Sequence, residues 1–232
     1  MPEEVSVQIE STKLHVETVA WHGAIDPGVL SHEERARLAT FASAERRRHF
    51  ALGRLAARHV VGACWGRAPE AVALVVDAGG AVTLESGHVS IAHGGRGFEA
   101  VGVAAYADRP VGVDVEAVGP RHPGLARRIV RPDEAGLLDA LGGPGDDSVT
   151  LVWALKEAVL KGQRTGLRAG ARSVRLAVDG PGGVVEAWSD RSGPWRVAFR
   201  RRGGLWMTVA TSVSPDPQSG LPVAAGATSG GR

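Results

Sequence analysis

The sequence predicts an α+β fold with largely antiparallel sheets. A long helical segment comes before a group of short β-branched segments, and the same order then occurs a second time. Glycine- and proline-rich turns separate neighbouring strands, as in hairpins. A parallel α/β sheet would instead require strands that alternate with helices along the chain.

The first half is predicted to contain one long helical region followed by strands. The helical region spans residues 31–65, is broken near 40–43 and ends at Gly66. Short strands are expected next, and Asp108-Arg109-Pro110 should turn the last two into a hairpin. The expected strands cover residues 72–76, 81–84, 89–92, 100–106 and 111–115.

The second half is predicted to repeat this order. Pro132 is placed to open a helix that Gly142-Gly143-Pro144 ends, and a longer helix is expected over 149–163. The strands that follow are expected over 174–178, 184–188, 195–200 and 205–213. Residues 214–232 contain mostly Pro, Gly, Ser and Ala, so we expect a disordered tail there.

Composition excludes several classes of protein. A formal charge of +2 over 232 residues is too small for a general nucleic-acid binder. The single cysteine, Cys64, excludes a disulfide scaffold and suits a reducing compartment. The chain has no apolar run of the ~20 residues that a membrane span needs, and its acidic N-terminus is unlike a signal peptide. We therefore expect a cytoplasmic protein that binds neither nucleic acid nor membrane.

Two short motifs carry the chemistry. In the strand 111–115, valines alternate with Gly112 and Asp114, so Asp114 and Glu116 share one face. In the later helix, Trp153, Glu157 and Lys161 stand four residues apart and share one stripe. Three carboxylates close to an ammonium group suit a hard divalent cation that holds a phosphate or diphosphate.

Lysine is rare in this chain, and its positions support the same interpretation. Of the 27 basic residues only Lys13, Lys156 and Lys161 are lysines, so two of the three lie in one helix. Compact ammonium groups suit a moving phosphoryl group. The plain alternative is a solvated Glu157–Lys161 pair on a helix surface, beside an edge strand whose wet face carries Asp114 and Glu116.

Together these motifs resemble the signature of the 4′-phosphopantetheinyl transferases, specifically the larger surfactin-synthetase-activating (Sfp) type. That family carries a G-[VI]-D-[VIL]-E strand followed by W-[SAT]-x-K-E-[AS]-x-x-K. Residues 112–116 and 153–161 match at every charged position, and a weaker likeness covers roughly residues 40–180. The resemblance implies two similar halves packed about a pseudo-twofold axis, each with an antiparallel sheet and a long helix. We expect these halves at residues 1–107 and 108–213 of a monomer.

The resemblance also implies a reaction. It is the transfer of 4′-phosphopantetheine from coenzyme A to a serine of an apo acyl or peptidyl carrier protein, as a holo-[acyl-carrier-protein] synthase performs it. Asp114, Glu116 and Glu157 would hold Mg²⁺ or Mn²⁺, and Glu157 or a water would accept the serine proton. Lys156 or Lys161 would neutralise the phosphoryl oxygens. The carrier, from fatty-acid, polyketide or nonribosomal peptide biosynthesis, is left open.

The resemblance places the phosphates of coenzyme A near the basic segment 45–58. Its candidates there are Arg46, Arg47 and Arg54, with His93 in the glycine-rich turn and Lys156 and Lys161 at the other end. On helical geometry alone, Arg47, Arg54 and Arg58 share a face that would simply be solvated, whereas Leu52 and Leu55 face the core. Glu134 is a candidate supporting residue, although an acidic first turn also complements the helix dipole.

The chain also departs from the family pattern. Ala92 and Gly94 stand where hydroxyl residues flank the family's histidine, and Gly80-Ala81-Val82 replaces a G-[KR]-P turn. These losses predict a weaker hold on the nucleotide end of coenzyme A. They leave a second class of function open, a descendant that binds coenzyme A or a carrier protein without catalysis. A nucleic-acid-binding module built on Arg46 to Arg58 is a third, disfavoured by the nearby carboxylates.

Overall fold

The computed structural model describes residues 3–9, 12–23, 26–165, 170–178 and 184–213. Among these residues, no helix is both long enough and apolar enough to span a membrane. The tail predicted at 214–232 lies outside the described residues. The α-helices are α1 His32–Ala39, α2 Ala44–Trp65, α3 Leu125–Ile129, α4 Leu137–Ala140 and α5 Asp146–Gly162. The strands are β1 Glu3–Ile9, β2 Thr12–Ala20, β3 Val75–Val76, β4 Val82–Thr83, β5 His88–Gly94, β6 Val101–Ala107, β7 Val111–Ala117, β8 Val174–Val178, β9 Val184–Ser189, β10 Gly193–Arg202 and β11 Leu205–Ser212.

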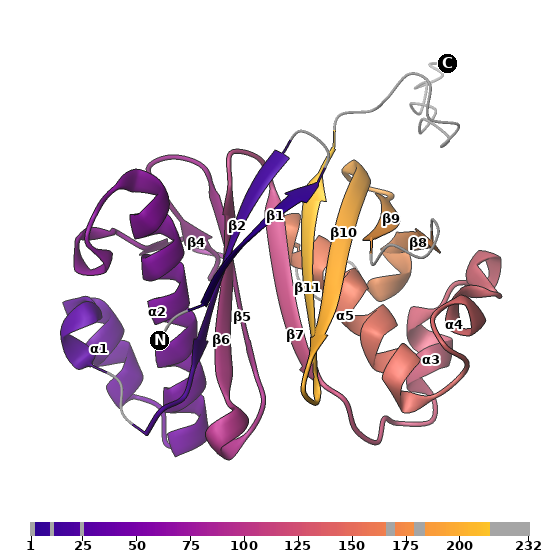
Figure 1. The fold of residues 1–232 in the computed structure, drawn as a ribbon, viewed down its shortest axis with the longest axis horizontal. Helices are drawn as coiled ribbons and strands as arrows, with labels where there is room; N and C mark the ends of the chain where they lie inside the picture. Colours follow the sequence, from indigo (N-terminus) through magenta and orange to yellow (C-terminus); the bar gives the residue numbers. More distant parts are fainter. Residues whose placement is uncertain (1–2, 10–11, 24–25, 166–169, 179–183, 214–232) are drawn as a thin grey trace, which may run out of the picture.

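Two antiparallel sheets form the centre of the molecule, and this confirms the predicted α+β class. One sheet has the order β1-β2-β6-β5 and the other the order β7-β11-β10-β9-β8. Every strand pair in them is antiparallel. The sheets pack against each other, with α2 on the outer side of the first and α5 on the outer side of the second (Figure 1). A pseudo-twofold relation between these halves remains a prediction.

Each layer is held by its own apolar cluster. Between the sheets, Val103 of β6 packs with Val113 of β7 and Val209 of β11. Leu155 of α5 belongs to the core of the second half, and Val60 of α2 to that of the first. The alternation in β7 therefore works as predicted, because its valines face the other sheet and leave the opposite face of the strand for α5.

The predicted hairpin at residues 108–110 is wrong. β6 pairs with β2 on one side and β5 on the other, so neither edge is left for β7. β7 pairs with β11 instead, which makes the turn after Ala107 a crossing from one sheet to the other. A tight turn between two strand-like segments cannot reveal this difference, because it depends on β2, which pairs with β6, and on β11, which pairs with β7, and both lie far away in sequence.

Other elements differ in extent. The strand predicted at 72–76 is only β3, because Val72 is buried in the core at the end of a 3-10 turn over Pro69–Ala71. The helix predicted from Pro132 is a single 3-10 turn followed by α4. β1 and β2 were not predicted, although both segments alternate apolar and polar residues. The break at 40–43 and the end of α2 at Gly66, which has φ +63°, are confirmed.

Candidate functional site

The site begins where α5 lies very close to β7. A side chain at Gly112 would collide with the carbonyl oxygen of Ala158, so only glycine permits this approach. Asp114, two residues further along β7, shares the same face and is only 4% exposed. The missing side chain at Gly112 therefore sets how close the Asp114 carboxylate lies to the helix.

The stripe predicted on the helix faces these carboxylates. The Trp153 Nε1 donates a hydrogen bond of 3.0 Å to Glu116 Oε1. One end of the stripe is thus tied to Glu116. At the other end, the Lys161 Nζ donates a hydrogen bond of 2.6 Å to Asp114 Oδ1. Glu157 stands between them on the helix and is 7% exposed.

Two oxygens in this cluster are buried and accept no hydrogen bond from the described residues, namely Asp114 Oδ2 and Glu157 Oε1. Burial raises the pKa of Asp114, although the Lys161 ammonium opposes the shift. Burial, followed by the charge of Asp114, raises the pKa of Glu157 to about 7. Buried carboxylate oxygens without partners are expensive unless a cation or a proton meets them.

Glu116 lies nearer the surface and is already engaged. Its Oε2 accepts a hydrogen bond of 3.0 Å from Arg121 Nη2, in an ion pair whose side chains are 22% and 27% exposed. Arg121 also donates to Thr150 Oγ1 at 2.9 Å, which anchors it to α5. Arg121 was not predicted as a site residue, because a lone arginine after a Gly-Pro pair belongs to no periodic pattern.

The side chains are not arranged as a complete metal site. In the part of the chain that the structure describes, no group of three or more His, Cys, Asp or Glu side chains is placed to hold a metal ion. Lys161 occupies one oxygen of Asp114, while Trp153 and Arg121 occupy Glu116. The free oxygens on Asp114 and Glu157 nevertheless fit the preference of Mg²⁺ for carboxylate ligands.

A cleft of about 540 Å³ lies next to this cluster, with Lys161 in its wall. Its other walls come from α2, from β5 and from the turn at residues 79–82, so both halves of the chain contribute. Within the described part of the chain, the lining residues include four cationic side chains and no carboxylate, which suits an anionic ligand. These cations are Arg46, Arg54, Lys161 and Arg164.

Of the three arginines predicted to contact phosphate, two line the cleft and one does not. Arg46 and Arg54 both line it, about two turns apart on α2. Arg54 Nε is also 3.8 Å from Glu34 Oε1, and burial lowers the pKa of Arg54. Arg47 does not line it, because its Nη1 donates to the Phe41 carbonyl at 2.5 Å and so holds the loop before α2.

The basic face of α2 is only partly solvated. Arg58 is 2% exposed; its Nη2 lies 2.8 Å from Glu34 Oε2, and its Nη1 donates to the Val72 carbonyl at 2.6 Å. Arg58 is therefore a structural residue, whereas Leu52 and Leu55 are buried as predicted. Glu34, which the sequence analysis missed, could have been inferred from its capping-box position after Ser31.

His93 lines the cleft beside a second histidine. Its ring stacks on His49 of α2, with centroids 4.8 Å apart and planes 15° from parallel. The His49 Nε2 lies 3.0 Å from the Gly95 carbonyl. Burial of the ring, helped by His49 and Lys161, lowers the pKa of His93 to about 4, so the ring is neutral near pH 7. His49 gave no signal in the sequence.

The neighbouring residues on β5 divide between the cleft and the core. Ser90 and Ile91 line the cleft, and Ser90 Oγ accepts a hydrogen bond of 3.0 Å from Val113 N of β7. Ala92 is 3% exposed and packs in the apolar cluster between the sheets. A hydroxyl at position 92 would therefore enter the core, and its absence removes no side-chain contact from the cleft.

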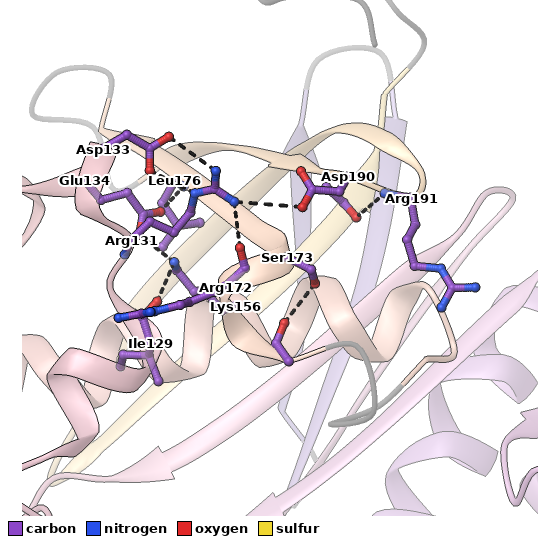
Figure 2. Close-up of polar contacts among 12 residues, drawn as sticks. Ile129, Arg131, Asp133, Glu134, Lys156, Arg172, Ser173, Leu176, Asp190 and Arg191 are labelled. Carbon is purple, nitrogen blue, oxygen red and sulfur yellow. Dashed lines mark hydrogen bonds and ion pairs between the residues drawn. The ribbon is translucent and has the colours of Figure 1, made fainter. Parts of the chain in front are cut away.

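Lys156 is not brought to the cleft. It is fully buried, and its Nζ donates to Glu134 Oε2 at 2.6 Å and to the Ile129 carbonyl at 2.7 Å (Figure 2). Glu134 also accepts hydrogen bonds from the backbone N–H groups of Arg131 and Leu176. Lys156 precedes Glu157 by one residue, about 100° around the helix, so it points away from the Asp114 cluster and toward Glu134.

Comparison with known proteins agrees with the motif evidence. The family model of the 4′-phosphopantetheinyl transferase superfamily matches residues 110–210, which contain β7, α5, β8 to β10 and most of β11. The resemblance to this superfamily is confirmed. The chain is also 28% identical over 159 residues to the 4′-phosphopantetheinyl transferase psf-1 of Bacillus pumilus. That alignment covers 65% of this chain and 66% of the relative, just under two thirds of its length.

Proposed function

We propose that this protein transfers 4′-phosphopantetheine from coenzyme A to a serine of an apo acyl or peptidyl carrier protein. One observation carries the proposal: buried carboxylates with free oxygens border a cleft lined by cations from both halves. Such a cleft suits a polyphosphorylated ligand, and the carboxylates suit the cation that accompanies a diphosphate. The likeness to the transferase superfamily adds the identity of the ligand and of the acceptor.

Asp114 and Glu157 would hold the divalent cation through their free oxygens, and Glu116 would join them once it exchanges its Trp153 or Arg121 partner. A cation bound there supplies charge neutralisation for the diphosphate. We propose Mg²⁺ as that ion, with Mn²⁺ as a substitute.

The chain's own residues supply position and charge. The Lys161 ammonium lies between Asp114 and the cleft, so it would meet the phosphoryl oxygens as the serine attacks. Glu157, directly or through a water, would accept the serine proton. Attack by the serine oxygen on the phosphorus next to pantetheine breaks the bond to the bridging oxygen, and adenosine 3′,5′-bisphosphate leaves.

The walls of the cleft would hold the rest of coenzyme A. Arg46 and Arg54 offer guanidinium groups, and neutral His93 offers a ring nitrogen. Arg47 would act through the loop at Phe41 rather than on the ligand. Lys156 would support the site through Glu134, which ties α5 to the segment after α3 and to β8.

Two further parts of the proposal concern the whole chain. We propose that residues 1–107 and 108–213 are the two halves, which meet at the cleft. We also propose a cytoplasmic monomer. The missing hydroxyl at position 92 was one reason to consider a non-catalytic protein. That reason no longer applies, because Ala92 faces the core.

Mass spectrometry of apo carrier proteins incubated with coenzyme A and Mg²⁺ tests the proposal. We expect one phosphopantetheine per carrier domain with the wild type and none with Asp114→Asn. A panel of carriers from fatty-acid, polyketide and nonribosomal peptide systems would also show which carrier is used. If the wild type modifies none while a characterised transferase modifies all, the enzymatic proposal fails.

A further inference from the structure

Arg164, just past the end of α5, has an unusual backbone. Its φ is +58°, and among the residues that the structure describes it is the one non-glycine residue with positive φ. Arg164 directly follows the C-cap of α5, where a left-handed residue, usually glycine, closes a helix, and a long side chain is strained there. The position would be easier for glycine, so the arginine side chain calls for an explanation.

The side chain of Arg164 is aimed at the cleft but is loosely held. It lines the cleft together with Lys161, one turn earlier, and is 38% exposed. Its Nη2 is 3.5 Å from the Val82 carbonyl, and its Nη1 is 4.0 Å from Asp77 Oδ2. Both distances are at the outer limit for such contacts, which leaves most of the guanidinium's donors available.

The turn opposite Arg164 does not depend on it. Asp77 Oδ1 accepts hydrogen bonds from Gly79 N at 2.8 Å and from Ala81 N at 2.9 Å. The backbone N–H of Gly80 also donates to the Asp77 carbonyl at 2.9 Å. The turn is therefore held by its own bonds, and its two glycines line the cleft without side chains that would fill it.

We propose that Arg164 binds a phosphate group of the ligand, between Lys161 and the turn at 79–82, as a specificity-determining residue of this site. The planar guanidinium can grip two phosphate oxygens at once, which the neighbouring ammonium cannot do. Its contacts with Val82 and Asp77 place the side chain at the cleft. That the phosphate belongs to coenzyme A rests on the proposed function; the phosphate-binding role itself rests on the cleft geometry.

Calorimetric titration with coenzyme A, dephospho-coenzyme A and inorganic pyrophosphate tests this inference. We expect Arg164→Gly to weaken coenzyme A binding about tenfold while the melting temperature stays equal or rises by roughly 2–4 °C, because the strain is relieved. Arg164→Lys should also bind more weakly than wild type, since an ammonium group cannot donate two parallel hydrogen bonds to one phosphate. Loss confined to coenzyme A would assign the contact to the 3′-phosphate, and equal loss with dephospho-coenzyme A to the diphosphate.

Two control variants separate ligand binding from a structural role. Asp77→Asn keeps the oxygen that holds the turn but removes the charge near Arg164, so coenzyme A affinity should stay at or above that of the wild type. Arg67→Ala removes an exposed arginine that pairs with Glu85 outside the cleft, and should change affinity less than twofold. If Asp77→Asn and Arg164→Gly lower coenzyme A affinity and melting temperature alike, then Arg164 only stabilises the turn at 79–82 and does not bind the ligand.

Pyrophosphate separates this inference from the proposed function. If the wild type binds pyrophosphate but not coenzyme A, the proposed function fails, and an Arg164-dependent pyrophosphate affinity still supports the inference. If the wild type binds coenzyme A and Arg164→Gly binds every probe as tightly, the inference is overturned while the function stands. If the wild type binds none of the three probes, both are overturned.

Discussion

At the scale of single residues, Asp114 combines burial, an ion pair and an unpaired oxygen. Asp114→Asn keeps the shape of the side chain and removes the charge that would hold a cation. We expect the rate of carrier modification to fall by about 100-fold or more, which corresponds to ~3 kcal/mol of transition-state stabilisation. Quench-flow or mass-spectrometric rates would measure it. Near-normal turnover at saturating Mg²⁺, with an unchanged circular dichroism spectrum, would show that Asp114 is not a ligand.

Replacing the two lysines of α5 should have different effects on stability and on transfer activity. Lys156→Met leaves Glu134 buried without its cation, so we expect the free energy of unfolding to fall by about 3–5 kcal/mol. Lys161→Met should cost less stability, because the Lys161 side chain is 31% exposed and Asp114 can take up a proton. It should nevertheless abolish transfer. Urea unfolding followed by activity per folded molecule measures both effects.

Equal stability losses for the two lysine variants would contradict the separation of their roles. So would full activity of folded Lys161→Met. The comparison is sharp because both lysines lie on one helix, five residues apart, with the same chemistry but different neighbours.

At the scale of elements, the close approach of α5 to β7 should depend on Gly112. Gly112→Ala places a methyl group against the Ala158 carbonyl, so the helix must move away from Asp114. We expect a stability loss of about 1–3 kcal/mol or more and a lower kcat. Gly119→Ala is the matched control, since a Cβ there meets nothing within 4 Å. Thermal unfolding and transfer rates would measure the effect, and a harmless Gly112→Ala would mean that the approach is less tight.

Local periodicity explains which parts of the site the sequence could predict. Asp114 and Glu116 are two residues apart on a strand, and Glu157 and Lys161 four apart on a helix, so each pair shares a face whatever the tertiary fold. Lys156 lies beside Glu157 in sequence, and its separate role depends on Glu134 reaching it from another element. His49 and Arg121 were missed for the same reason, because His93, which stacks on His49, and Thr150, which anchors Arg121, lie far away from them in the chain.

At the scale of the whole molecule, the same limit applies to the topology. The α+β class followed from the order of helices and strands, which local patterns show well. The assignment of β6 and β7 to different sheets could not be predicted from local patterns. It depends on β2 and β11, which lie at opposite ends of the described chain. The cleft arises from that partition, since residues from both halves form its walls.

Because the cleft is shared between the halves, its ligand should stabilise the whole fold. Coenzyme A at about 100 times its dissociation constant should add ~2.7 kcal/mol to the free energy of unfolding, which corresponds to a melting temperature higher by roughly 5–10 °C. At the same coenzyme A concentration, Arg46→Ala and Arg54→Ala should each reduce this shift, because both guanidinium groups line the cleft from the first half. Arg47→Ala should keep it, since Arg47 binds the loop at Phe41 instead. Differential scanning fluorimetry with and without coenzyme A measures all four proteins side by side. A shift that survives in both Arg46→Ala and Arg54→Ala would mean that the ligand engages only the second half, and the proposed role of α2 would then be wrong.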